Sequence, residues 1–160
     1  MNQSAMLADF VRNTDLDIVM CAGRYTLLEQ GALEDLLPAA ASANVSVVAA
    51  AVFNSGLLAR NRPTANATYD YAPAPPKILA RVNAIADLCQ SHGVALPAAA
   101  LQFTLAHPAV ATVCTGARTA SQVERNAALF DVDIPAALWS DLADAGMIHP
   151  DGPRPKENTK

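Results

Sequence analysis

The sequence predicts an α/β domain built on a small parallel sheet, and two observations carry this prediction. Short apolar runs of strand length alternate along the chain with longer amphipathic segments of helical period. The 160 residues are 52% hydrophobic, largely alanine, and only 5% aromatic. Such a composition favours helices packed closely on a parallel sheet over an aromatic-rich β-sandwich. We therefore expect βαβ units with right-handed crossovers.

The first third of the chain carries the patterns of two helices and two strands. Residues 4–12 have apolar side chains at helical spacing behind Ser4, a candidate N-cap. Residues 16–21 are a continuous apolar run of strand length. Residues 32–43 place leucines on one helical face, and the valine-rich residues 45–52 predict a second buried strand.

A long polar connection separates these elements from the rest. The helix predicted over residues 77–92 has one apolar stripe, opens with Pro75 and Pro76, and closes at Gly93. The remaining predicted elements are a helix over residues 96–106, a strand over 110–114, a helix over 121–129 and a helix over 136–145.

Three strands are too few to bury both faces of a sheet, whereas a closed (β/α)₈ barrel takes roughly 250 residues. The chain therefore forms either a small open α/β domain or part of a larger one. We assign residues 1–149 to this domain. The polar, proline-rich residues 150–160 are expected to be a disordered tail.

Composition argues against several classes of function. The net charge is −4 with no basic run, which disfavours nucleic acid and anionic membranes as partners. No signal peptide and no apolar run of about 18 residues is present, so we expect a soluble, cytoplasmic protein. Cys21, Cys89 and Cys114 are expected to be reduced core residues. No Cys or His pair has metal-ligand spacing and no nucleophile elbow occurs, so we predict neither a metal site nor a hydrolase.

The junction between the last predicted strand and the next helix is suited to an anion. Gly116 allows a tight turn, and Thr119 with Gln122 forms a capping-box pattern. The helix start directs free N–H groups and the positive end of its dipole above the strand. Arg118 adds a forked donor set that suits a phosphate. The alternative is that Arg118 is a solvated residue of an ordinary strand-to-helix loop.

Four motifs together resemble the C-terminal half of an aldo/keto reductase. The resemblance is to the sugar-dehydrogenase subgroup, of the D-threo-aldose 1-dehydrogenase or L-fucose dehydrogenase type, and it covers nearly the whole chain. The motifs are residues 22–28 (AGRYTLL), 52–59 (VFNSGLLA), 69–74 (YDYAPA) and 116–118 (GAR) followed by Gln122 and Asn126.

This resemblance implies the C-terminal part of an incomplete (β/α)₈ barrel, whose three strands would be the sixth, seventh and eighth. The implied activity is NAD(P)-dependent oxidation of an aldose at its anomeric carbon, or the reverse carbonyl reduction. The family's catalytic Asp, Tyr, Lys and His come from the first half of the barrel. We therefore assign no catalytic residue here and expect the chain alone to be inactive. The alternatives are a non-catalytic half-barrel that binds a nucleotide or a complementary chain, and the remnant of a split gene.

The resemblance also implies the residues that contact NAD or NADP. Tyr25 would pack near the nicotinamide, although a core tyrosine at a strand end is an open alternative. Two departures from the family's pattern, Cys114-Thr115 for Ile/Val-Pro and Arg125 for an acidic residue, predict weaker cofactor binding. The implied partners are the cofactor, a small sugar or carbonyl substrate in a complete barrel, and a second copy or a complementary half-barrel. The implied contacts are Phe53, Asn54, Ser55, Gly56 and Leu57 along the pyrophosphate and nicotinamide, and Gly116, Ala117, Arg118, Gln122 and Asn126 at the adenosine end.

Overall fold

The centre of the molecule is a parallel sheet of three strands. The computed structural model describes residues 1–64, 66–150 and 152–155. The strands lie in the order β1 (Ile18–Ala22), β2 (Ser46–Ala50) and β5 (Val110–Cys114). Ala22 pairs with Ala50, which pairs in turn with Cys114, so the carboxyl ends of the strands lie side by side. The α/β class predicted from the sequence is confirmed.

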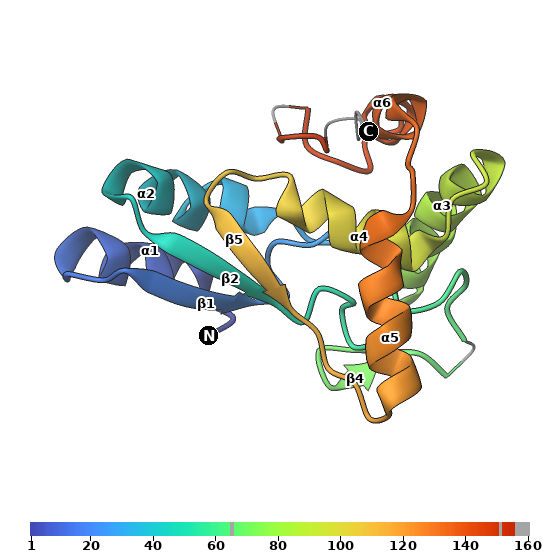
Figure 1. Ribbon diagram of the computed structural model, residues 1–160, viewed down its shortest axis with the longest axis horizontal. Helices are drawn as coiled ribbons and strands as arrows, with labels where there is room; N and C mark the ends of the chain where they lie inside the picture. Colours follow the sequence, from blue (N-terminus) through green and yellow to red (C-terminus); the bar gives the residue numbers. More distant parts are fainter. Residues whose placement is uncertain (65, 151, 156–160) are drawn as a thin grey trace.

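Helices cover one side of this sheet and extend beyond it (Figure 1). α1 packs on α2, α2 packs on β2, and α4 packs on β5, while α3 contacts both α4 and α6. The arrows of all three strands point toward the end of the molecule that carries β4 and α5 (Figure 1). The helices are α1 (Ser4–Asn13), α2 (Leu36–Ala43), α3 (Pro76–Ser91), α4 (Leu96–Leu105), α5 (Ala120–Ala128) and α6 (Ala136–Asp144), with short 3₁₀ turns η1 (Gly31–Leu33) and η2 (Leu129–Asp131).

The two faces of the sheet differ sharply. Val19 and Cys21 of β1 and Val47 and Ala49 of β2 point into the helix-covered core. Their neighbours point the other way, because side chains alternate along a strand. On that uncovered face Ile18 is 53% exposed and Met20 is 48% exposed. The described strands therefore form an open segment of sheet rather than a closed barrel.

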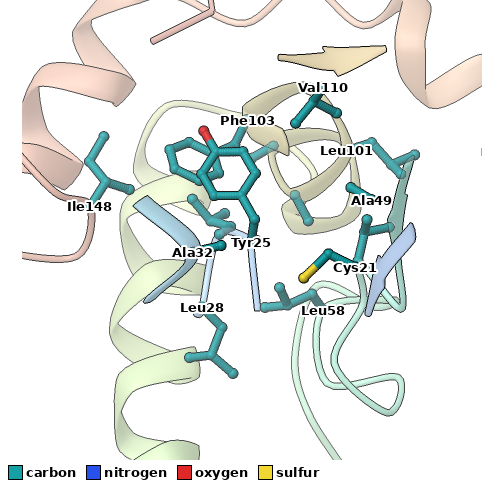
Figure 2. Close-up of a cluster of buried hydrophobic side chains, with 14 of the residues drawn as sticks. Cys21, Tyr25, Leu28, Ala32, Ala49, Leu58, Leu101, Phe103, Val110 and Ile148 are labelled. Carbon is teal, nitrogen blue, oxygen red and sulfur yellow. The ribbon is translucent and has the colours of Figure 1, made fainter. Parts of the chain in front are cut away.

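The hydrophobic core lies between the sheet and the helices, and Tyr25 stands at its centre (Figure 2). The Tyr25 ring lies 5.6 Å from the ring of Phe103 and 5.6 Å from that of His107, measured between centroids. Phe103 in turn lies 6.4 Å from Trp139 of α6. This row of rings joins the loop after β1 to α4 and α6.

The first residue of the chain pairs with the outer edge of β1. The Met1 N-terminus donates to the Met20 carbonyl at 3.0 Å, and the Met1 carbonyl accepts from the Ala22 N–H at 2.8 Å. These two bonds flank Cys21 in the pattern of a parallel ladder. Met1 therefore covers the carboxyl end of the β1 edge and leaves Ile18 on an open edge.

The long polar connection contains a hairpin that the sequence did not predict. β3 (Thr68–Tyr69) pairs antiparallel with β4 (Ala72–Pro73), and the turn residues Asp70 and Tyr71 have left-handed φ angles of 46° and 66°. Two successive left-handed residues are the conformation of a type I′ hairpin turn. Strands of two residues carry no detectable alternation, and this turn lacks the Asn-Gly signal, so no sequence pattern marks it.

Three expectations about local structure were wrong. Ser4 is not an N-cap: its hydroxyl donates to Asp35 Oδ2 at 3.1 Å, so it ties α1 to the start of α2. The helix predicted over residues 32–43 is divided into η1 and α2, because the Asp35 carboxylate accepts the Leu36 N–H and starts a new helix. Cys114 is exposed, because it ends β5 outside the helix-covered core.

The structure adds limits on membrane insertion and on the tail. Within the described ranges no helix combines the length and the apolar character needed to cross a bilayer. Of the predicted disordered tail, residues 151 and 156–160 lie outside the described residues. In the described part of that segment Gly152 is buried and its N–H donates to the His149 carbonyl at 3.0 Å.

Candidate functional site

The carboxyl ends of β2 and β5 are neighbours, and the loops that follow them carry most of the predicted cofactor contacts. Ala50 and Cys114 are paired residues at the ends of these strands. The loop after β2 holds residues 53–57, and the loop after β5 leads through residues 116–118 into α5. The sheet thus brings two segments about sixty residues apart in sequence to one edge, as expected for parallel strands.

The loop after β2 is tightly wound. Ala51, Asn54 and Ser55 all have left-handed φ angles, of 52°, 44° and 57°, and Gly56 follows at 90°. For residues with a Cβ this conformation is unfavourable, so it persists only where the surroundings enforce it. Leu57 is fully buried and anchors the loop in the core. Its side chain is therefore turned away from the surface, and only its backbone could meet a ligand.

Asn54 joins this loop to the loop after β1. The Thr26 hydroxyl donates to Asn54 Oδ1 at 2.6 Å, and Asn54 Nδ2 donates to the Gly23 carbonyl at 3.4 Å. Thr26 Oγ1 also accepts the backbone N–H of Glu29 at 2.9 Å. Asn54 and Thr26 are both buried. The Asn54 amide thus braces the backbone, and no pattern in the sequence singled out Thr26 beyond its place in the AGRYTLL motif.

The start of α5 confirms the predicted cap at Thr119. Thr119 Oγ1 accepts the Gln122 N–H at 3.3 Å. Gln122 Oε1 accepts the Arg118 N–H at 2.7 Å, one residue before the position expected in a capping box. The Gln122 side chain is consequently engaged with the loop backbone through its carbonyl oxygen. The conformation of the loop before α5 is fixed by these two bonds.

Arg118 is exposed and, within the described residues, makes no ion pair. Gly116 and Ala117 beside it are also exposed. Gly116 does not adopt a left-handed φ. A Cβ added to Gly116 would meet no atom within 4 Å. The backbone at Gly116 therefore borders open space, two residues before the exposed Arg118.

Phe53 and Asn126 are also withdrawn from the surface. Phe53 is partly buried and packs against the hydrophobic core. Asn126 is buried on α5. These two side chains are thus less accessible than those of Ser55 and Arg118, which are exposed.

Tyr25 is, like Leu57, a predicted contact whose side chain lies in the core. Its side chain is 2% exposed, and its hydroxyl has no hydrogen-bond partner among the described residues. Burial raises the pKa of this phenol above its usual value. The ring packs on Phe103 (Figure 2) and also on His107, so its position matches the core role that the sequence left open.

Tyr69 and His107 are held by structural contacts. Tyr69 donates its hydroxyl to Glu29 Oε1 at 2.7 Å, and burial together with this carboxylate raises its pKa to about 12. His107 Nδ1 accepts the Ala109 N–H at 3.1 Å, and burial lowers the pKa of its imidazole. No group of three or more His, Cys, Asp or Glu side chains suited to a metal ion occurs among the residues that the structure describes.

Comparison with known proteins places these features in a family. The profile of the Aldo/keto reductase family matches residues 2–146. The chain is 46% identical over 145 residues to a D-threo-aldose 1-dehydrogenase from Pseudomonas sp, covering 91% of this chain and 44% of that protein. It is 40% identical over 147 residues to a pyridoxal 4-dehydrogenase from Microbacterium luteolum, covering 92% and 43% of the two chains.

A solved aldo-keto reductase from Bacillus halodurans in its holo form superposes with a TM-score of 0.68 at 22% identity. The match covers 88% of this chain and 46% of that chain. At this identity the likeness shows the fold alone. The chain spans less than half the length of the relatives it matches.

Proposed function

The chain belongs to the aldo/keto reductase family, and we propose that it supplies the dinucleotide-binding half of an NAD(P)-dependent barrel. In this proposal the whole barrel oxidises an aldose or a related cyclic alcohol, or reduces the corresponding carbonyl. The names of the two relatives, one an aldose dehydrogenase and one a pyridoxal dehydrogenase, support a small polar substrate.

One observation carries the proposal. The paired carboxyl ends of β2 and β5 bring the wound loop of residues 53–57 next to the start of α5. In barrels of this architecture a phosphate site commonly forms from the loops after the seventh and eighth strands. Here those two loops supply exposed backbone, a capped helix start and the cation of Arg118, which has no ion-pair partner among the described residues.

The residues present fit a nicotinamide dinucleotide. Gly116 leaves open space where a Cβ would stand, so an anionic group can approach the backbone closely. The Arg118 guanidinium offers a forked pair of donors to a phosphate. Ser55 and Gly56 present exposed backbone on the neighbouring loop. We propose Arg118, Gln122 and Asn126 for the adenosine end, and residues 53–57 for the pyrophosphate and nicotinamide.

When bound, a nicotinamide cofactor accepts a hydride from the substrate carbon or returns one to a carbonyl. The residues of this chain would bind and orient it, and they would hold its phosphates at the edge of the sheet. We assign no proton-transfer residue to the chain. Tyr25 is enclosed in the core, Tyr69 is bonded to Glu29, and the His107 Nδ1 accepts a backbone N–H.

Calorimetry on the purified chain tests the binding proposal. We expect NADP⁺ and adenosine 2′-phosphate to bind, with no aldose-dependent reduction of NAD⁺ or NADP⁺ by the chain alone. Failure of both ligands to bind would remove the proposed dinucleotide role. Turnover that persists after contaminating reductases are removed would mean that residues of this chain form a proton relay.

The uncovered sheet face supports a second role, association with a complementary half-barrel or a second copy. Ile18 and Met20 expose apolar surface next to the open edge of β1, which is a template for strand pairing. Sedimentation at micromolar concentration tests this. We expect dimers or larger species, and a compact monomer with a sharp melt would favour a self-sufficient domain.

A further inference from the structure

The motif of residues 69–74 contains a tyrosine that neither the packing of the core nor the proposed function explains. Tyr71 is the second turn residue of the β3–β4 hairpin, and it is 103% exposed. A side chain this exposed packs on nothing in the described chain. A large ring left in water gains none of the free energy that burial would supply. The ring of Tyr71 therefore contributes nothing to the stability of the core.

The backbone also gives no reason for a tyrosine at this position. Tyr71 has a left-handed φ of 66°, and Asp70 before it has a φ of 46°. Such turns usually have asparagine or aspartate followed by glycine, because a Cβ makes the left-handed region unfavourable. Asp70 has a structural partner, since its carboxylate accepts from the Arg24 guanidinium at 2.9 Å. Tyr71 stands where glycine would be more favourable, and its side chain has no such partner in the described chain.

Two contacts hold the hairpin beside the carboxyl end of β1. Arg24, which bonds Asp70, lies two residues beyond the end of that strand. The Tyr69 hydroxyl donates to Glu29 Oε1 at 2.7 Å. The arrows of the sheet point toward the end of the molecule that carries β4 (Figure 1). Tyr71 is thus held on the side of the sheet where enzymes with this barrel architecture carry out their chemistry.

The base of the hairpin adjoins the loop proposed for the nicotinamide. Thr68, the first residue of β3, lines a pocket of about 250 Å³ together with Ser55 and Gly56. A preformed wall loses less conformational entropy when it binds a ligand. The hairpin therefore offers a fixed aromatic side chain near the loop that would hold the reactive end of the cofactor.

We propose that Tyr71 is a specificity-determining residue whose ring packs on the ring face of a cyclic substrate. The inference rests on the proposed function and names the substrate feature that is recognised. An aldose in its pyranose form carries C–H groups on its ring faces, and the negative face of an aromatic ring attracts such groups. An acyclic polyol has no ring face. Tyr71 would thus select cyclic over acyclic substrates.

The position of Tyr71 favours a small molecule over a protein partner, although aromatic residues also anchor protein interfaces. The apolar side chains proposed for association, Ile18 and Met20, lie on the uncovered face of the sheet. Tyr71 instead lies on a hairpin at the carboxyl end of the strands. Contact with a partner chain is therefore an outcome that the experiment has to detect.

Proton NMR of the chain tests the inference directly. The chain has three tyrosines, and a Tyr71→Phe variant identifies the signals of Tyr71. We expect L-fucose, titrated in the presence of NADP⁺, to shift the ring signals of Tyr71 until they saturate. The signals of Tyr25 and Tyr69 should not move. Glycerol, an acyclic polyol, should shift none of the three.

Three variants separate the ring from the backbone. Tyr71→Gly removes the ring and suits the left-handed φ, so the urea midpoint of unfolding should not fall. It should weaken L-fucose binding, measured by saturation transfer to the sugar, about tenfold, the upper range for an aromatic contact. Tyr71→Phe keeps the ring and should retain binding. Phe10→Ala, which removes a half-exposed ring from α1, should leave binding unchanged.

The outcomes separate this inference from the proposed function. Unshifted Tyr71 signals, or equal shifts with glycerol, would overturn the inference, while binding of NADP⁺ or adenosine 2′-phosphate would still uphold the dinucleotide role. A lower urea midpoint in Tyr71→Gly would mean that the ring is structural. Loss of self-association in that variant with unchanged sugar binding would mean that the ring contacts a partner chain. Either result also overturns the inference. A Tyr71 shift without binding of NADP⁺ would uphold it and remove the dinucleotide role.

Discussion

The loops after β2 and β5 leave the same edge of the sheet and are built in opposite ways. The loop after β2 is anchored in the core by Leu57 and Leu58 and braced by the Asn54–Thr26 hydrogen bond. The loop after β5 is exposed through Arg118 and is fixed only where it meets the cap of α5. Buried anchors determine backbone shape, whereas an exposed, unpaired cation remains available to a ligand. The loop after β2 therefore has a fixed backbone conformation, and the loop after β5 presents an exposed positive charge.

Removing a core anchor should have the largest effect. Leu58 is fully buried, so Leu58→Ala should lower the free energy of unfolding by about 2–5 kcal/mol through lost burial and a residual cavity. Urea unfolding followed by circular dichroism measures this. The control is Val123→Ala on α5, which is largely exposed and should change stability by about 0.5 kcal/mol or less. Similar losses in both variants would contradict the contrast between the loops.

The contribution of the Asn54–Thr26 hydrogen bond to stability can be separated from that of the left-handed backbone at Asn54. Asn54→Ala leaves the buried Thr26 hydroxyl without its acceptor and should cost about 1–3 kcal/mol. Asn44→Ala is a matched control, because Asn44 also has a left-handed φ, of 55°, at the end of α2 but is exposed. The same unfolding measurement should show the larger loss at Asn54. Equal losses would assign the whole effect to backbone conformation.

In the loop after β5, a substitution of Arg118 should weaken cofactor binding rather than lower the free energy of unfolding. Arg118→Ala should weaken NADPH binding by about 1–3 kcal/mol, the range for a lost charge-assisted hydrogen bond, and NADH binding by less if the contact is the 2′-phosphate. Calorimetry of both cofactors measures this, with Arg12→Ala on α1 as the control. Equal, negligible effects on both cofactors would remove Arg118 from the site.

The stability of the folded chain should also depend on pH, through His107. Burial lowers the pKa of His107, so the folded protein favours the neutral imidazole. Below about pH 6.5 the unfolded chain takes up the proton more readily, and stability is lost as the pH falls. His107→Gln should show a smaller loss of stability between roughly pH 7.5 and 5.5. An unchanged pH profile in this variant would show that His107 does not contribute.

The smallest effect is expected at Tyr25. Its buried hydroxyl has no partner among the described residues, so Tyr25→Phe should leave stability unchanged or raise it by about 1 kcal/mol. Cofactor binding should not change if the ring belongs only to the core. Weaker NADP⁺ binding with unchanged stability would return Tyr25 to the cofactor site.

Much of the fold was predictable from short-range patterns. The strand over residues 110–114 was predicted with its observed bounds, and the helix of residues 77–92 differs from α3 by one residue at each end. Apolar period and proline or glycine at element ends act locally, so the sequence carries them directly. The cap at Thr119 is local in the same sense.

The site was less predictable, because its contacts join residues distant in sequence. The Thr26–Asn54 bond spans 28 residues, and the Arg24–Asp70 pair spans 46. Neither leaves a periodic signal in the chain. The resemblance to a family identified the loops, but it did not indicate which of their side chains brace the backbone and which face solvent.

The sequence by itself determined the alternation of helix and strand and the capped helix start behind Arg118, because each depends on residues within a few positions of one another. The alternation of strand and helix in turn favours a parallel sheet. The tertiary structure alone decided that Tyr25 lies in the core, that Cys114 is exposed and that Asn54 braces two loops. Those outcomes depend on which face of the sheet the helices cover. That choice follows from the packing of the whole chain.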